Sequence, residues 1–285
     1  MTRTTPKLHG HTRPNAERPL VRMITAFVIY LVCIFMMERY GNAGLVLFCR
    51  ITGIRYMAPY TGAFLKMLGI LVVMLIVCLL IHQFGVFYRR RRSFLYGVFV
   101  GGYMFLYALW GFFAALSGTR EFQDKETVIF SVLYFILVGV TEELVFRGIT
   151  ADLLLQALYK KNPGGQPEIA AVVISGAVFS LVHALNFRRS GASGVLIQML
   201  GVFVLGMMLT AVYYRTANIY AVMVLHAFND IAAALPVTFL KSDMSVADVI
   251  SGYGLKQVWL LIPYLIVLVF LLRKKKRREI RELWV

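Results

Sequence analysis

Two long stretches of this sequence carry no charged residue, at positions 93–119 and 190–214. A helix needs about 20 mostly apolar residues to cross the hydrocarbon core of a bilayer, which is roughly 30 Å thick. Apolar residues make up 59% of the chain and charged residues 15%, against about 45–50% and about 25% in soluble domains. The sequence therefore predicts an integral membrane protein and excludes a cytosolic enzyme.

Further apolar segments continue this pattern along the chain, and nothing between them is typical of a separate soluble domain. The first segment is followed by Glu38 and Arg39 rather than by small residues, which favours an uncleaved helix over a signal peptide. The prediction is one all-α polytopic bundle over residues 1–285. We expect about eight transmembrane helices, near residues 20–38, 62–88, 94–116, 127–160, 168–187, 193–214, 216–240 and 255–272.

The basic residues indicate how this bundle is oriented. If both termini are cytoplasmic, 19 of the 30 Lys and Arg residues lie inside, 10 lie outside, and Arg147 lies within a helix. That bias follows the positive-inside rule, although Arg188 and Arg189 run against it. The net charge of +16 is therefore expected to face anionic lipid headgroups. No water-exposed basic module is present that would bind nucleic acid.

Ionisable side chains inside apolar helices are rare and costly, and the fourth predicted helix carries several of them. Glu143 and Arg147 are four residues apart, so they can pair along one face of the helix. Glu142 is rotated by about 100° from Glu143. One carboxylate is thus neutralised and the other is left available. Further along the same helix, we interpret Asp152 as a structural or solvated residue where the over-long helix leaves the membrane.

Two histidines lie in other apolar helices. His183 follows Phe179 by four residues, and His226 precedes Asn229 and Asp230, with Asp230 on its own helix face. A single histidine in an apolar helix is more often an interhelical hydrogen-bonding group than a catalyst. The ion pair of the fourth helix could likewise lock two helices together, and a proton relay in a transporter would use the same residue types.

Taken together, these groups suit the hydrolysis of a peptide bond. That reaction requires a base that activates water, a donor for the oxyanion and an acid for the leaving amine. A free glutamate, two histidines and a further polar residue from three helices could supply all of these. The sequence has no HExxH and no GxSxG motif, which argues against a zincin or a serine hydrolase.

The ordered motifs EExxxR, FxxxH and HxxxN/D resemble those of the CPBP family. This group contains CAAX prenyl endopeptidases and bacteriocin-processing or immunity proteins, also called Abi. The motif-bearing core covers residues 127–240. The resemblance implies an intramembrane endopeptidase in which Glu142 activates water and His183 and His226 complete the catalytic centre. By the same resemblance, supporting roles fall to Glu143, Arg147 and Phe179.

The resemblance also places Asp230 where the family often has asparagine. An ionised aspartate cannot donate to an oxyanion, so Asp230 would be protonated, orient His226 or help to bind a metal, and Asn229 could donate in its place. Whether a metal is needed stays open. Zn²⁺ is the candidate cofactor, and its possible ligands are Glu142, His183, His226 and Asp230.

Several functional questions stay open at this level. The expected partner is a membrane-associated protein or peptide substrate, and no feature shows whether it is prenylated. The alternative hypothesis is a non-proteolytic membrane immunity or scaffold protein that retains the motifs. A multi-pass protein of this kind would lie in the plasma membrane of a bacterium, which we prefer, or in the endoplasmic reticulum of a eukaryote.

Overall fold

The computed structural model describes residues 18–54, 57–88, 92–117 and 121–284. These residues are almost entirely helical, and β-type pairing among them is limited to an isolated antiparallel bridge between Phe122 and Leu240. The helical elements are α1 (Pro19–Thr52), α2 (Thr61–Leu80), η1 (Phe84–Phe87), α3 (Phe94–Val100), α4 (Gly102–Leu116), α5 (Lys125–Glu143), η2 (Leu144–Ala151), α6 (Asp152–Lys161), α7 (Pro167–Val182), η3 (His183–Arg188), α8 (Ala192–Thr216), α9 (Ile219–Thr238), α10 (Val246–Ser251), α11 (Leu255–Trp259), α12 (Leu261–Leu271) and α13 (Lys274–Trp284).

Six helices of the described chain are long and apolar enough to cross a membrane. They are α1, α2, the continuous column of α5, η2 and α6, α7 with η3, α8 and α9. Two further pairs would each make one more span: α3 with α4, bent by 76°, and α11–α12 with α13, bent by 64°. The all-α membrane bundle is thus confirmed, with six to eight candidate spans.

Several helix boundaries differ from those predicted. The helix expected at 20–38 continues as α1 to Thr52, because no proline or αL residue interrupts it before Gly53, where φ is 74°. The helix expected at 62–88 ends at Leu80, and His82 then turns the chain with φ of 53°.

Two more of the predicted membrane-spanning helices are divided into shorter helices. The helix expected at 94–116 bends at Gly101, where an added Cβ would lie 2.3 Å from Cδ1 of Leu225, so this side chain of α9 packs directly on the glycine. The helix expected at 255–272 is divided at Leu260 and is followed by α13, which the sequence analysis did not predict. Helix α13 is strongly basic, but it also has a short apolar face, on which Ile280 is fully buried. The many basic residues make this face hard to recognise in the sequence.

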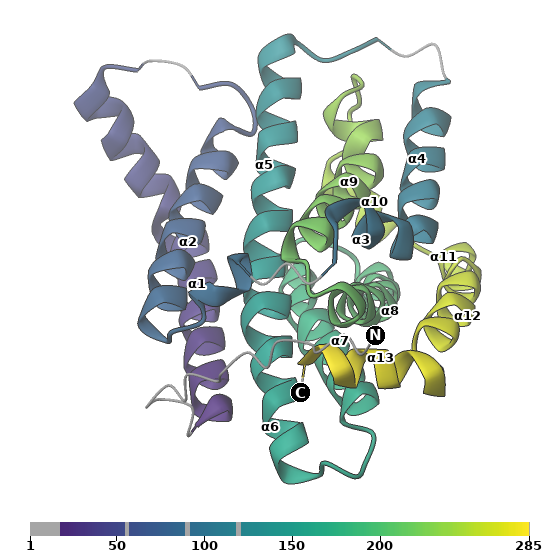
Figure 1. The fold of residues 1–285 in the computed structure, drawn as a ribbon. Coiled ribbons are helices and arrows are strands. Elements are labelled where there is room, and N and C mark those ends of the chain that lie inside the picture. The colour runs from purple at the N-terminus through teal and green to yellow at the C-terminus, as the bar shows by residue number, and fades with distance from the viewer. Residues whose placement is uncertain (1–17, 55–56, 89–91, 118–120, 285) are drawn as a thin grey trace.

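The column of α5, η2 and α6 runs through the length of the bundle (Figure 1). It packs against α2 through α5, against α1 through η2 and α6, against α7 through η2 and α6, and against α9 mainly through α5. Helices α7 and α8 pack on each other, and α4 packs on α9. This column therefore touches the helices that carry both motif histidines.

The start of α5 is fixed by local hydrogen bonds. Asp124 accepts from the backbone N–H of Thr127 (2.9 Å) and from its hydroxyl (2.7 Å), which caps the helix. These two bonds hold the pKa of Asp124 below its usual value. Gln123 N donates to Phe239 O, and Lys241 N donates to Glu121 O, both at 2.8 Å. The beginning of α5 is thereby tied to the end of α9.

A glycine allows α5 and α9 to meet closely at the depth of the motifs. An added Cβ on Gly139 would lie 2.8 Å from the backbone N of Ala227 and 3.0 Å from its Cα. Ala227 follows His226 directly, and Gly139 is about one helical turn before Glu142 and Glu143. This contact therefore sets how near the motif carboxylates come to the histidine of α9.

The Gly139→Ala variant is expected to lose about 1–3 kcal/mol of stability, because the new methyl group meets backbone that cannot rotate away. Thermal unfolding in detergent measures this effect. Gly111→Ala is the matched control, because nothing lies within 4 Å of an added Cβ there. Equal stability of the two variants would contradict the close-contact account.

Candidate active site

A buried chain of charged groups joins α5, η2 and α9. Arg147 Nη1 donates to Glu143 Oε1 at 2.5 Å, and the same oxygen lies 2.7 Å from His226 Nδ1. Glu143 and Arg147 are fully buried, and the His226 side chain is 3% exposed. The expected ion pair between Glu143 and Arg147 is present. One oxygen of Glu143, Oε1, is thus shared between Arg147 and His226, and the whole carboxylate is buried away from water.

The helix is wound differently where Arg147 lies. Residues Leu144–Ala151 form a π-helical segment within the α5–α6 column, and such segments often occur at functional sites. Arg147 Nη2 donates to the carbonyl of Gly206 on α8 at 3.1 Å, and its guanidinium carbon lies 4.5 Å from the centre of the Phe179 ring. Arg147 therefore links α8 and α7 to the helix of the two glutamates.

The other nitrogen of His226 faces the remaining two motif carboxylates. His226 Nε2 lies 3.4 Å from Asp230 Oδ2 and 3.7 Å from Glu142 Oε2. A proton on this nitrogen would be shared between the two acids. The Glu142 side chain keeps 14% of its surface exposed and that of Asp230 keeps 25%, whereas Glu143 has none. Glu142 is thus the glutamate of the pair that a water molecule can reach.

His183 is oriented by the backbone of its own helix. Its Nδ1 lies 3.1 Å from the carbonyl oxygen of Phe179. A carbonyl oxygen only accepts, so Nδ1 carries the proton, and in the neutral ring Nε2 is then the acceptor. The Phe179 ring makes edge contacts with His183 (5.2 Å between ring centres) and with His226 (5.6 Å). The Phe179 ring thus packs against both imidazoles.

The structure thus brings almost the whole predicted set together from α5, η2, α7, η3 and α9. Asn229 lies on α9 beside this cluster, with no side-chain hydrogen bond recorded to another described residue. Of the two alternatives for Asp152, structural or solvated, the structure supports the structural one. Asp152 is 0% exposed and accepts hydrogen bonds from the side-chain amides of Gln83 and Gln156.

Other contributors were missed at the sequence level. They are the Gly206 carbonyl, Gly139, and the aromatic pair Phe146 and Tyr30, whose rings meet edge-on at 5.7 Å. Each acts through backbone or ring surface, which leaves no pattern of polar residues in the sequence. A small residue one turn before the EE pair was the available signal for Gly139.

The side chains of the site offer part, but not all, of what a metal ion would need. Both histidines have Nδ1 engaged, by Phe179 O and by Glu143, and so present Nε2, which is the usual arrangement of a zinc ligand. In the described part of the chain, however, no three His, Cys, Asp or Glu side chains are grouped so that they could hold a metal ion together. The described side chains therefore do not fit a metal centre, and the proposed reaction uses these side chains alone.

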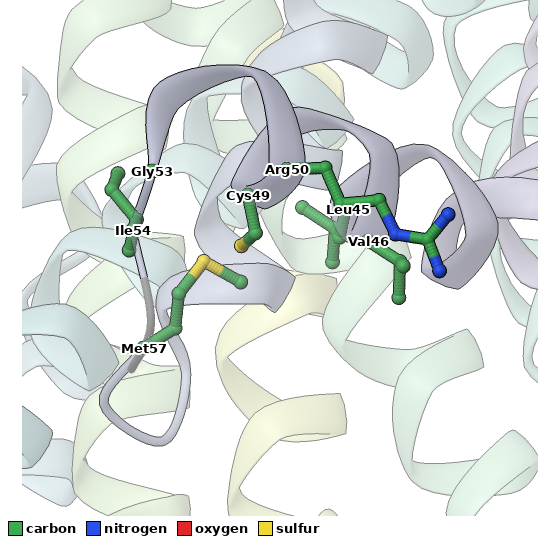
Figure 2. A pocket seen from close by; sticks show the side chains of 7 residues that line it. All are labelled: Leu45, Val46, Cys49, Arg50, Gly53, Ile54 and Met57. Carbon is green, nitrogen blue, oxygen red and sulfur yellow. The ribbon is translucent and has the colours of Figure 1, made fainter.

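A hollow of about 420 Å³ lies elsewhere, at the C-terminal end of α1. Figure 2 shows its lining side chains, with the guanidinium of Arg50 pointing away from Ile54. The lining contains no acid and no histidine; it consists of Leu45, Val46, Cys49, Arg50, Gly53, Ile54 and Met57. This hollow is therefore distinct from the motif cluster.

The comparison with protein families bears on this cluster directly. Residues 124–232 match the family described as type II CAAX prenyl endopeptidase Rce1-like. The matched family is part of the CPBP family. The matched range includes both glutamates, Arg147, both histidines and Asp230, and it ends within α9. This match, together with the apolar helices, supports a protease that is an integral, multi-pass membrane protein. No curated protein and no solved structure matches the chain.

Proposed function

We propose that this protein is an intramembrane endopeptidase of the CAAX-processing type, in which Glu142 activates the water that attacks the peptide bond. The observation that carries the proposal is that the two adjacent glutamates differ in burial and in contacts. Glu143 is fully buried and contacts both Arg147 and His226, whereas Glu142 is partly accessible to water and lies beside His226 Nε2. Such a pair, one carboxylate fixed and one free, suits general base catalysis.

The proposed reaction proceeds by direct attack of water. Glu142 takes a proton from the water as the oxygen bonds to the scissile carbonyl carbon, and the carbonyl oxygen becomes an oxyanion. When the tetrahedral intermediate breaks, the carbon–nitrogen bond is lost and the proton held by Glu142 passes to the leaving amine. The products are a new carboxyl terminus and a new amino terminus.

The histidines and Asp230 complete this scheme. The distance of 3.4 Å from His226 Nε2 to Asp230 Oδ2 supports Asp230 as the group that orients His226 rather than as an oxyanion donor. His183 packs against the same Phe179 ring and presents Nε2, which can bind the attacking water or the leaving nitrogen.

The environment proposed for this enzyme is a bilayer with anionic headgroups on the side of the basic segments. Arg22 donates to Ile81 O, and Asn218 Nδ2 donates to Arg92 O, so two basic segments predicted to be cytoplasmic contact residues of the predicted helices at 62–88 and 216–240. Arg215 at the end of α8 pairs with Glu279 of α13 (3.1 Å). The exposed basic residues of this region support the orientation with both termini inside; they are Arg273, Lys274, Lys275 and Arg278. The preferred location is a bacterial plasma membrane.

Loss of either histidine tests the proposal with the purified protein in liposomes. His183→Ala and His226→Ala are each expected to reduce cleavage of CAAX-terminated peptides, offered with and without an isoprenyl group, by about 10²-fold or more. Leu185→Ala, an exposed residue of the same η3 segment as His183, should cleave as the wild type does. Full activity in both histidine variants would contradict the proposal and favour a non-proteolytic immunity or scaffold role.

A further inference from the structure

A buried side chain outside the family-matched segment contacts the π-helical part of the central column. Gln83 lies between α2 and η1 and is 5% exposed. Its Nε2 donates to the carbonyl of Gly148 at 3.2 Å and to Asp152 Oδ2. Val86 of η1 packs on the same glycine, where an added Cβ would lie 3.3 Å from its Cγ2. The η1 segment is thereby joined to η2 by a polar and an apolar contact.

The Gly148 carbonyl lies where the winding of the column changes. The backbone N–H of Asp152 donates to Arg147 O, five positions earlier, as in a π-helix. From Asp152 the chain continues as α6, and in an α-helix each N–H reaches back four positions. A return from five positions to four leaves one carbonyl without a donor from its own helix, and Gly148 O is the next carbonyl after Arg147 O. A buried carbonyl needs a hydrogen-bond partner, and the Gln83 amide provides one.

The neighbours of the Gln83 amide determine which way it points. Arg22 Nη2 donates to Gln83 Oε1 at 3.3 Å, and a guanidinium has no acceptor. On the other side, the Gly148 carbonyl and the Asp152 carboxylate only accept. The Nε2 group of Gln83 is therefore directed at η2, while its Oε1 is held by Arg22.

The segment that Gln83 contacts carries the ion pair of the candidate site. Arg147 lies in η2 and donates to Glu143, directly before this segment, and to Gly206 O of α8. The same oxygen of Glu143 lies 2.7 Å from His226 Nδ1. A return of η2 to α-helical winding would turn α6 by about 100° relative to α5 for the residue removed from the wider turn. Arg147 would then be displaced from one of its two partners, and the orientation of His226 would change with it.

We infer that Gln83 is a positioning residue for the proposed endopeptidase. Its amide holds η2 in the π-helical winding that keeps Arg147 on Glu143, and Glu143 in turn orients His226. Gln83 acts through these residues rather than by contact with the reacting groups. The inference rests on the proposed function, and it extends the functional unit to the junction of α2 and η1, outside the matched residues 124–232.

The Gln83→Met variant tests the inference, because methionine has a similar length and lacks the amide. We expect kcat per folded protein in liposomes to fall by about 10- to 100-fold, since small displacements of catalytic groups have effects of this size. KM should change less than threefold, because no contact with substrate is altered.

Gln156→Met is the matched control for the same substitution. It removes the other side-chain amide that donates to Asp152, at 3.1 Å, and leaves the bond to Gly148 in place. Gln156 is exposed on α6, so water can replace the lost donor. This variant should keep the kcat of the wild type.

Gln83→Glu is a second variant that separates the donor from the acceptor. A carboxylate keeps the bond from Arg22 but cannot donate to Gly148 O. The same fall in kcat at similar KM is expected, with folded protein measured by thermal unfolding in detergent. Wild-type kcat in both Gln83 variants would overturn the inference, as would an equal fall in kcat for Gln156→Met. If neither Gln83 variant yields folded protein while Gln156→Met does, Gln83 serves folding alone and the inference is also overturned.

The outcomes separate this inference from the proposed function. If Glu142→Gln is inactive and the Gln83 variants retain the kcat of the wild type, only the role of Gln83 is overturned. A rise in KM at unchanged kcat would place Gln83 in substrate binding and would overturn it as well. If Glu142→Gln cleaves as the wild type does, the proposed function itself fails.

Discussion

The Glu142→Gln variant is expected to lose peptide cleavage by about 10²- to 10⁴-fold while it inserts and folds normally. The amide has nearly the shape of the carboxylate but cannot take a proton from water. No hydrogen bond to another described residue is lost, since the nearest recorded contact of Glu142 is His226 Nε2 at 3.7 Å. Removal of a negative charge beside Asp230 and Glu143 should leave stability unchanged or slightly raised.

Initial rates with purified protein in liposomes measure this effect, and thermal unfolding in detergent checks the fold. Gln257→Glu on α11, where the side-chain oxygen accepts from the backbone N–H of Gly254 and a carboxylate would keep that bond, is the control for the reverse change and should retain cleavage. Retained cleavage in Glu142→Gln would show that another group activates the water.

The Arg147→Met variant is expected to lose about 3–5 kcal/mol of stability, the largest structural effect in the molecule. Arg147 is fully buried, and its loss would leave the Glu143 carboxylate buried with only His226 as a recorded partner. The bond to Gly206 O, which ties α8 to η2, would be lost as well. Denaturant or thermal unfolding in detergent measures the change.

A second variant separates charge from packing at this position. Glu143→Gln combined with Arg147→Met leaves no uncompensated charge, and replacing a buried ion pair by neutral groups is often close to neutral in stability. The double variant should therefore recover at least half of the stability that the single variant loses. A double variant as unstable as Arg147→Met would show that the side chain acts through packing rather than through its charge.

The sequence was sufficient to predict the membrane class and the pairing of Glu143 with Arg147. Both depend on local rules, namely the length of an apolar run and the spacing of four residues on a helix. Residues 124–232, over which the family match extends, also contain every residue that the motifs had singled out. The catalytic roles of Glu142, His183, His226 and Asp230 stay predictions until cleavage is measured.

Contacts between distant helices could not be predicted in this way. The packing of the Leu225 side chain of α9 on Gly101 is one such contact, and the closeness of α5 to α9 depends on Gly139 meeting Ala227. The sequence left Asp152 as either structural or solvated for the same reason, since its hydrogen bond from Gln83 comes from a residue 69 positions away.

In the proposed function, Glu142 drives hydrolysis of a peptide bond in a membrane-associated protein or peptide. Terminal-peptide mass spectrometry on membranes that contain either the wild type or Glu142→Gln is the most direct test. We expect new pairs of carboxyl and amino termini that are present only with the wild type and that name the substrate and the bond. An identical set of termini in both membranes, with equal amounts of folded protein, would contradict it.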